Sequence, residues 1–512
     1  MSGETEKKEQ TKKNKSFFRK DGVWAFSTYF AEGFPFIIIR NLSTFFFRDM
    51  NVSHELIGLS TSFFSLPWIL KFLWGPWVDE YSNKRRWMLS MQMGLFFMMV
   101  LAALLFPLKD GVLLIAILFF IGAFLSATND ISIDGYYMVV LDKAGQAKFL
   151  GYRVMAYRVA MLTGTAGISR IAAYQGWYWA FVASFSIFGL VLFFHLFFLK
   201  EDALPKKKIT ELFSRAFHGK SLIYGMGGIL VIASVYLFFT SQFYKEVQGN
   251  VPFLAKIDFA TGVTILLFLG LVILALSRKK ITAFITRDPD SYYGKAFLSF
   301  MAQEKIGAIL AFIILLRAGE FTLSTMTNPF IVDLGLKMHY WWLTGFVGLP
   351  ATILGAMLGG WMISKFSLKK LAFPFILAQN VTNIIYALLA FHLAKFITLN
   401  AGGEHITSVG MFNIVLVAIT HGFDQFSGGL GTAVLMTYLM RICHRDYKAS
   451  HFAIGSALMG LSNPFVSALS GHIVHAWGYG TLFGMSFLFS IPGMILIPFI
   501  PYLSDNSRYG EA

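Results

Sequence analysis

The stretch from Leu66 to Arg86 reads LPWILKFLWGPWVDEYSNKRR, and its pattern returns at residues 349–370 as LPATILGAMLGGWMISKFSLKK. In both places an apolar run begins with a Leu-Pro pair and contains a Gly-x-Trp motif, Gly75-Pro76-Trp77 or Gly359-Gly360-Trp361. Basic residues follow each run. Each copy is the second apolar segment in a block of six. Gly and Pro are common in membrane helices, but a repeat that keeps position, order and orientation indicates two parallel halves of a helical membrane bundle.

The composition of the 512 residues also indicates a membrane protein. Hydrophobic residues make up 56% and charged residues 14% of the chain, whereas a soluble domain carries about 25% charged residues. The 55 phenylalanines are more than a soluble core could hide, but a bilayer can accommodate them. The single cysteine, Cys443, excludes an internal disulfide and a multi-cysteine metal site, and we expect no metal and no cofactor.

Fourteen segments are long and apolar enough to cross a bilayer, which takes about 20 residues each. They lie near 23–47, 55–78, 87–108, 111–140, 154–174, 177–199, 221–243, 259–276, 306–331, 341–364, 371–394, 407–440, 452–475 and 480–502. The expected domains are an N-terminal tail (1–21), a six-helix bundle (22–200), a linker with two additional transmembrane helices (201–305), a second six-helix bundle (306–503) and a C-terminal tail (504–512).

The basic residues predict the orientation. Thirty-one Lys and Arg residues lie in the two tails and in the loops of one side, and six lie in the loops of the other side. Because basic loops stay in the cytoplasm, both termini are expected there. The net charge of +15 is therefore mainly a topology signal, and we expect no nucleic-acid partner. The first apolar segment contains Glu32 and Arg40 and is too long for a cleaved signal peptide.

Ionisable residues inside the spans are the candidate functional residues. A charge at mid-span costs roughly 2.5–3.5 kcal/mol, so such side chains must face the bundle interior or a wet cavity. Asp130 and Asp134 are four residues apart and share one helix face. Two close carboxylates in a low-dielectric cavity do not both ionise easily, which suits a proton-coupled site. The alternative for each charged pair is a static salt bridge between helices.

We assign the remaining candidates by the same reasoning. Arg317 and Glu320 are three residues apart and can pair on one face, and Asp424 precedes the glycine-rich run 428–431. The candidates for proton or substrate coupling are Asp130, Asp134, Glu32, Glu320 and Asp424. The candidates for substrate binding are Arg40, Arg158, Arg317, Tyr157, Asn129 and Gln425. None is assigned a catalytic role, and His421 is expected to be a polar cavity residue rather than a metal ligand.

Several motifs resemble those of AmpG-type muropeptide permeases, a branch of the major facilitator superfamily. In the first half these are residues 71–79 followed by 84–87, residues 126–134 and residues 156–162; in the second half they are residues 351–360, 428–433 and 449–458. The resemblance covers both halves and implies a major facilitator fold, that is, two six-helix bundles plus two extra helices between them. By similarity to the superfamily's loop motif, Asp79, Lys84, Arg85 and Arg86 are expected to act in gating.

The resemblance also implies a function. Such a carrier would import GlcNAc-1,6-anhydro-MurNAc, with or without peptide, across the bacterial inner membrane, driven by protons. The cargo would enter peptidoglycan recycling and, in some bacteria, β-lactamase induction. The expected partners are this small molecule or a related anionic saccharide, protons and the lipid bilayer, and the expected state is a monomer.

Two alternatives remain open. Gly135-Tyr136-Tyr137 follows the second aspartate where the permeases often have a basic residue, and it is similar to acetyl-CoA transporters, which form a related branch. The cargo could therefore be acetyl-CoA or a sugar-peptide conjugate. A membrane-embedded enzyme or a carrier-fold sensor is a different class; the chain has no His-Glu-x-x-His motif, no multi-histidine metal motif and no Gly-x-Ser-x-Gly motif.

Overall fold

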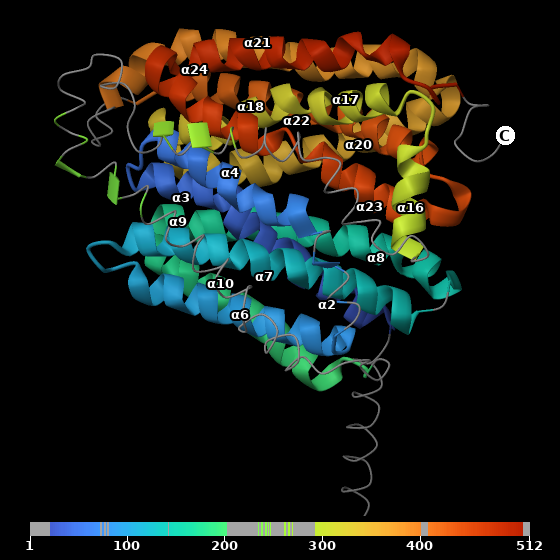
Figure 1. The fold of residues 1–512 in the computed structure, drawn as a ribbon. Helices are drawn as coiled ribbons and strands as arrows, with labels where there is room; N and C mark the ends of the chain where they lie inside the picture. The colour runs from blue at the N-terminus through green and yellow to red at the C-terminus, as the bar shows by residue number, and fades with distance from the viewer. Residues whose placement is uncertain are drawn as a thin grey trace, which may run out of the picture. The chain divides into compact units, whose positions relative to one another are not determined.

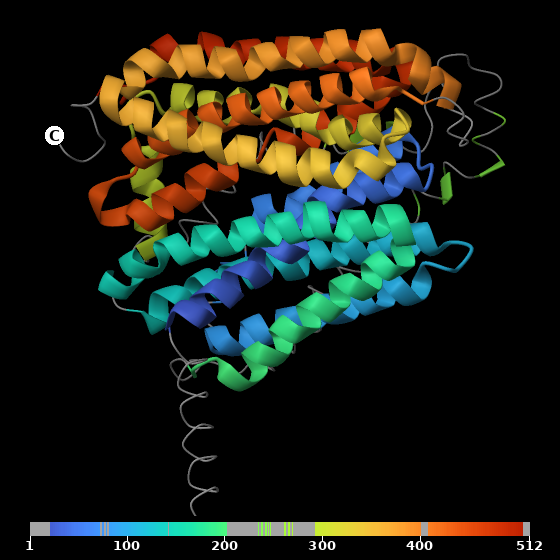
Figure 2. The same cartoon turned by 180° about the vertical axis from the view of Figure 1, so that it is seen from behind.

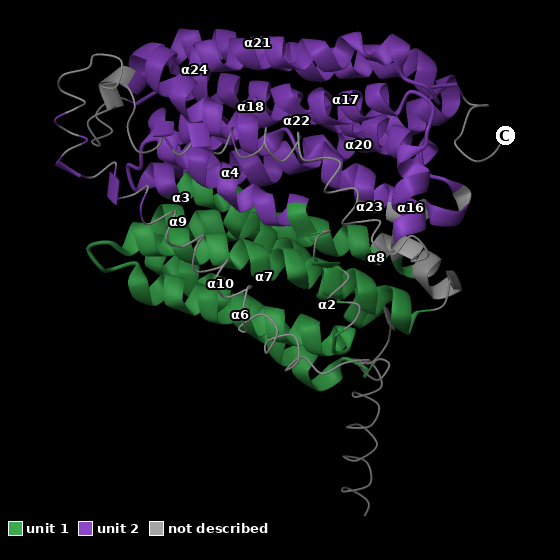
Figure 3. Ribbon diagram, viewed as in Figure 1, with its two compact units in different colours: residues 1–46, 70–230 green, residues 47–69, 231–512 purple. Residues whose placement is uncertain are grey.

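The computed structural model describes residues 21–71, 81–141, 143–201, 292–400 and 408–504, together with scattered positions at 74–78 and 234–269. The chain forms two compact units (Figure 3): residues 1–46 and 70–230 make unit 1, and residues 47–69 and 231–512 make unit 2. In the described part of the chain the regular elements are all helical. This confirms the expected helical class.

The described helical segments of unit 1 are shown in Figure 1. They are α2 (Asp21–Ile37), the π-helix η1 (Ile38–Leu42), α3 (Ser43–Asp49), whose last residues belong to unit 2, α6 (Lys84–Leu105), α7 (Gly111–Val140), α8 (Lys143–Leu162), the π-helix η3 (Thr163–Ile168), α9 (Ser169–Gln175) and α10 (Trp177–Phe198). Helix α2 packs against α7 and α8, and α6 packs against α7 and α10. Asn83 caps the start of α6, because its side chain accepts a hydrogen bond from Arg86 N at 2.8 Å.

Unit 2 contains the helices of the second half of the chain (Figure 2) and α4 (His54–Leu70). The others are α16 (Tyr292–Met301), α17 (Ile306–Leu316), α18 (Ala318–Asp333), η5 (Lys337–His339), α19 (Tyr340–Trp342), η6 (Leu343–Gly348), α20 (Leu349–Phe366), α21 (Leu368–Asn400), α22 (Met411–Arg441), η7 (Arg445–Tyr447), α23 (Lys448–Met459), α24 (Asn463–Ile495) and η8 (Ile497–Phe499). Helices α20 and α21 pack against α22, and α18 and α21 pack against α24. The side chains between α17, α21 and α22 form one apolar core.

Eight helical stretches in the described part of the chain are long and apolar enough to cross a membrane. The last of them, Ile454–Phe499, contains a break at Gly478, where a φ of +78° interrupts the helix. Glycine adopts this left-handed conformation without a steric penalty. The break falls between the two spans predicted at 452–475 and 480–502. The two additional spans predicted at 221–243 and 259–276 lie mostly outside the described residues, so the count of fourteen and the domain limits stay predictions.

Helix α4 packs closely on α24 although its sequence neighbours belong to unit 1. A Cβ atom on Gly58 would lie 2.4 Å from the backbone oxygen of Ser467, and one on Gly471 would lie 2.2 Å from the backbone oxygen of His54. Small residues at such positions let two helix backbones approach in a membrane. The glycines therefore fix α4 against α24 within unit 2.

The glycines of α20 give a matched test of the packing against α22. A Cβ on Gly355 would lie 1.9 Å from the backbone oxygen of Phe426, whereas a Cβ on Gly360 would meet no atom within 4 Å. We expect Gly355→Ala to destabilise the protein by ~1–3 kcal/mol through overpacking. Gly360→Ala should be neutral or stabilise it by ~0.5–1 kcal/mol through helix propensity. Thermal unfolding of both variants in the same detergent checks the pair, and equal melting temperatures would contradict the close approach.

Candidate functional site

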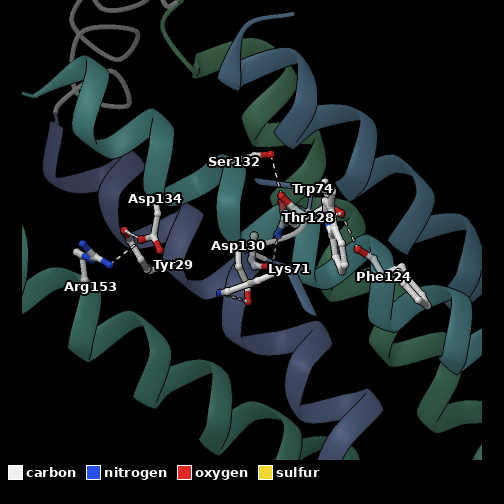
Figure 4. A network of polar contacts seen from close by, with 11 residues as sticks. Tyr29, Lys71, Trp74, Phe124, Thr128, Asp130, Ser132, Asp134 and Arg153 are labelled. Atoms are coloured by element: carbon white, nitrogen blue, oxygen red, sulfur yellow. Dashed lines mark hydrogen bonds and ion pairs between the residues drawn. The ribbon is translucent and has the colours of Figure 1, made fainter. Parts of the chain in front are cut away.

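Asp134 of α7 lies at the centre of a charged and aromatic cluster in unit 1 (Figure 4). Its Oδ1 atom accepts a hydrogen bond from the Tyr29 hydroxyl at 2.7 Å and forms an ion pair with Arg153 Nη2 at 2.8 Å. The Arg153 guanidinium lies over the rings of Tyr29 and Tyr137, with its Cζ at 4.0 and 4.7 Å from the ring centres. The stacking orients the cation. With 43% of its side chain exposed, Asp134 remains accessible to solvent or substrate.

Asp130 lies one turn earlier on α7 and has a different cation. Lys71 Nζ lies 3.9 Å from its Oδ2 atom (Figure 4). Only 10% of the Asp130 side chain is exposed. The two aspartates predicted to share one face therefore each have their own basic partner. These bases could not be identified from the sequence, because Lys71 follows α4 and Arg153 lies on α8, and the pairing depends on how these segments pack against α7.

Glu32 of α2 adds a third carboxyl group to this part of unit 1. Its Oε2 atom is buried and accepts no hydrogen bond in the described part of the chain. It lies within electrostatic range of both α7 aspartates and of Lys71 and Arg153. Three acids and two bases therefore belong to one electrostatic cluster, which we call the α7 acid cluster: Glu32, Asp130, Asp134, Lys71 and Arg153.

The predicted substrate-binding cations of unit 1 lie next to this cluster. Arg40 is in the π-helix η1, and π-helical turns occur frequently at functional sites. Tyr157 on α8 packs against Gly33, where an added Cβ would be 2.9 Å from its ring. Tyr157 lies within electrostatic range of Arg40 and Arg158 as well as of Glu32. The structure thus brings Arg40, Tyr157 and Arg158 together.

Asn129 belongs to a buried polar network rather than to an open surface. Its Nδ2 donates to the backbone oxygen of Ala31 at 3.1 Å, and its Oδ1 accepts from Gln92 Nε2 at 3.4 Å. Gln92 Oε1 lies 2.7 Å from His195 Nδ1, and His195 Nε2 lies 2.9 Å from Ser27 Oγ. The network joins α2, α6, α7 and α10. His195 and Gln92 were not predicted as polar-network residues. A histidine and a glutamine within apolar spans could have indicated such a network, because polar side chains inside a membrane span need partners.

Unit 2 contains a second polar cluster. Arg317 lies at a break between α17 and α18, with φ −94° and ψ 2°, and binds Glu320 with two nitrogens; its Nε is 2.9 Å from Oε2. Gln379 of α21 donates to the same Oε2 atom at 2.8 Å. The predicted pairing of Arg317 with Glu320 is present, and Gln379 is a partner that the sequence did not identify.

Asp424 of α22 has only neutral hydrogen-bond partners in the described part of the chain. Thr382 Oγ1 on α21 is 2.8 Å from Oδ1, and Gln425 Nε2 is 3.2 Å from Oδ2. Gln425 Oε1 also lies 2.9 Å from Thr352 Oγ1 on α20. One turn before Asp424, His421 Nδ1 lies 2.8 Å from the Tyr386 hydroxyl.

An ion-pair cluster that the sequence analysis missed holds residues 48–55 within unit 2. Asp333 at the end of α18 pairs with Arg48 and with His54 Nε2, the latter at 3.0 Å, and accepts from the Tyr479 hydroxyl at 2.6 Å. Two flanking pairs are Lys337–Asp49 at 2.6 Å and His475–Glu55 at 2.5 Å. These residues lie at helix ends, where a sequence search for charges inside spans does not look.

The predicted gating residues are only partly described. Asp79 lies outside the described residues. Lys84 Nζ donates to the backbone oxygen of Val78 at 2.9 Å, and Arg85 Nη2 donates to that of Leu196 at 3.0 Å. Both cations thus bind backbone carbonyls in unit 1. A Cβ on Gly135 would lie 2.8 Å from Lys84 Cε, so the glycine after the second aspartate makes room for this lysine.

His451 lies just before the last apolar stretch and connects α23 to α16. Its Nε2 donates to the backbone oxygen of Ala296 at 2.9 Å, and its Nδ1 accepts from His444 N at 3.1 Å. These contacts fix one neutral tautomer. Burial lowers the pKa of His451, and the hydrogen bond to Ala296 opposes this effect. Among the residues that the structure describes, no three His, Cys, Asp or Glu side chains are placed to hold a metal ion.

The long apolar helices, with partnered charges inside them, define a multi-pass membrane protein. The model of the Major Facilitator Superfamily matches residues 25–423, and the chain belongs to this family. It is therefore a carrier rather than an enzyme.

The chain is similar to named relatives over most of its length, as the motifs predicted. It is 24% identical to "Putative transporter AmpG 1" of Rickettsia prowazekii (strain Madrid E), covering 93% of this chain and 96% of that protein. It is also 24% identical to "Anhydromuropeptide permease" of Escherichia coli (strain K12), covering 91% and 77%. A crystal structure of the peptide transporter POT in complex with sulfate has the same fold, with a TM-score of 0.62, 11% identity and coverage of 93% and 94%.

Proposed function

We propose that the chain is a proton-coupled transporter that imports muropeptides, GlcNAc-1,6-anhydro-MurNAc with or without peptide, across the bacterial inner membrane. The α7 acid cluster supports this proposal most directly, because it places three carboxyl groups and two bases within a membrane-spanning unit. Arg40 and Arg158 next to the cluster supply cations for an anionic saccharide. The names of the relatives support the cargo.

The proposed orientation follows from the basic loops. With these loops and both termini in the cytoplasm, the turn at 50–53 faces the periplasm. The basic residues 84–86 then lie at the cytoplasmic end, where with Asp79 they would close the carrier. The carrier would act as a monomer, supply peptidoglycan recycling and contribute to β-lactamase induction where the host has that response.

A second cargo class deserves testing because of one observation. The side chain of Lys84 covers Gly135, the position at which the sequence is similar to acetyl-CoA transporters. A cation beside Asp134-Gly135 would suit a phosphate-bearing cargo as well as a carboxylated saccharide. We therefore keep acetyl-CoA as the alternative substrate.

Uptake into sealed vesicles distinguishes these cargoes. We expect purified protein in proteoliposomes to accumulate radiolabelled anhydro-muropeptide when the lumen is more alkaline than the outside, and to stop when a protonophore removes the gradient. Labelled acetyl-CoA serves as the competing cargo in the same vesicles. If the vesicles accumulate acetyl-CoA and no muropeptide, acetyl-CoA is the cargo. Binding of muropeptide without uptake would identify a sensor, and either result would contradict the proposal.

A further inference from the structure

Thr382 contacts two oxygen acceptors with one hydroxyl group. Its Oγ1 atom lies 2.6 Å from the backbone oxygen of Gln379, one turn earlier on α21, and 2.8 Å from Asp424 Oδ1 on α22. A hydroxyl has a single proton to donate, and a backbone carbonyl can only accept. The two acceptors must share the Thr382 proton unless the Asp424 carboxyl group is protonated and donates a second proton to Thr382 Oγ1.

The other carboxyl oxygen does not change this conclusion. Gln425 Nε2 donates to Asp424 Oδ2 at 3.2 Å, which a protonated and an ionised carboxyl group both permit. The Thr352 hydroxyl also lies near two oxygen acceptors. It is 2.9 Å from Gln425 Oε1 and 3.0 Å from the backbone oxygen of Gly348. If each contact is to have a proton of its own, an ionised Asp424 allows three of these five contacts to be hydrogen bonds, and a protonated Asp424 allows four.

The electrostatic surroundings also favour a neutral carboxyl group. Asp134 and Asp130 each have a basic partner, whereas Asp424 has no ion-pair partner among the described residues. Among the described residues, the charged or titratable groups near Asp424 are Glu320 of α18, which is bound to Arg317, Tyr386 of α21, and His421 one turn earlier on α22. Arg317 is already bound to Glu320 by two nitrogens, so it does not offset a second carboxylate.

We propose that Asp424 carries a proton in this conformation and donates it to Thr382 Oγ1, while Thr382 donates its own proton to the Gln379 backbone. Thr382 is the positioning residue of this proton site. When Asp424 ionises, the Thr382 hydroxyl must turn from Gln379 to the carboxylate. This inference deepens the proposed function, because it places one of the transported protons.

Infrared difference spectroscopy of the purified protein at neutral pH tests the site without transport. A protonated carboxyl group gives a C=O stretching band, which we expect in the wild type and not in Asp424→Asn. Removing the acceptor in Thr382→Val should shift the band to higher frequency, because a carboxyl group that loses a hydrogen bond absorbs higher. Thr382→Ala also removes the hydroxyl group and replaces the valine variant if that variant does not fold.

Two control variants isolate the hydroxyl group. Thr382→Ser keeps it and should leave the band in place. Thr437→Val makes the same substitution at a threonine whose hydroxyl, among the described residues, donates only to the backbone oxygen of Ala433, at 2.7 Å. This variant should also leave the band unmoved. Absence of an Asp424-dependent band, or a band that Thr382→Val and Thr382→Ala do not move, would overturn the inference. If the bands behave as expected but vesicles take up no muropeptide, the proton site stands and the proposed function fails.

Discussion

Asp134→Asn is expected to abolish gradient-driven accumulation of muropeptide while the protein still folds. Asparagine has the size of aspartate, but it carries no charge to balance Arg153 and cannot take up a proton. The Arg153 guanidinium would stay stacked over Tyr29 and Tyr137 with its positive charge unpaired. We expect initial uptake to fall by at least tenfold, which corresponds to about 1.4 kcal/mol. The measurement is uptake into proteoliposomes with an imposed pH gradient.

The controls separate charge from general damage. Asp446→Asn makes the same substitution at an aspartate whose side chain is 74% exposed, and it should transport like the wild type. Arg153→Lys keeps the charge but loses the planar group that stacks on two rings, so it should retain part of the activity. A folded Asp134→Asn protein that accumulates substrate at the wild-type rate would exclude Asp134 from the coupling step.

The sequence predicted contacts within a helix better than contacts between helices. The spacing of Arg317 and Glu320 is enough to place them on one face, and the structure has them bound. The partners of Asp134 and Asp424 come from α8 and α21, and they depend on which helix face turns toward which neighbour. A single sequence without the packing does not contain that information, so Arg153 and Thr382 could not be selected.

The sequence also did not predict which unit each helix belongs to. Apolar length identified α4 as a span, but residues 47–69 group with the second half of the chain. The physical cause is the contact of Gly58 and Gly471, where missing side chains allow two backbones to approach. A glycine in an apolar segment indicates close packing, but it does not say against which helix.

Among single substitutions in unit 2, we expect replacement of Asp333 to cause the largest decrease in the free energy of unfolding. It binds Arg48 and His54 and accepts from Tyr479, with only 8% of its side chain exposed. Removing one partner of a buried ion pair leaves the other charge uncompensated, at a cost of ~3–5 kcal/mol. Asp333→Ala should therefore lower the melting temperature in detergent by about 5–10 °C. Thermal unfolding followed by tryptophan fluorescence measures the change, with Asp446→Asn as the exposed control.

A double-mutant cycle with Arg48 tests whether the loss comes from the ion pair. Arg48→Met leaves Asp333 without its guanidinium partner, but His54 and Tyr479 still bind the carboxylate, so this single change should cost less than Asp333→Ala. The cycle compares the single variants Arg48→Met and Asp333→Leu with the double variant that carries both changes and removes both charges. Apolar side chains of similar size often replace a buried pair at little cost. The double variant should be more stable than the sum of the single losses predicts, by at least ~1 kcal/mol. Strict additivity would mean that Arg48 and Asp333 do not stabilise each other, and that the attachment of residues 48–55 rests on the helix packing of α4 and on the ion pairs of Asp49, His54 and Glu55.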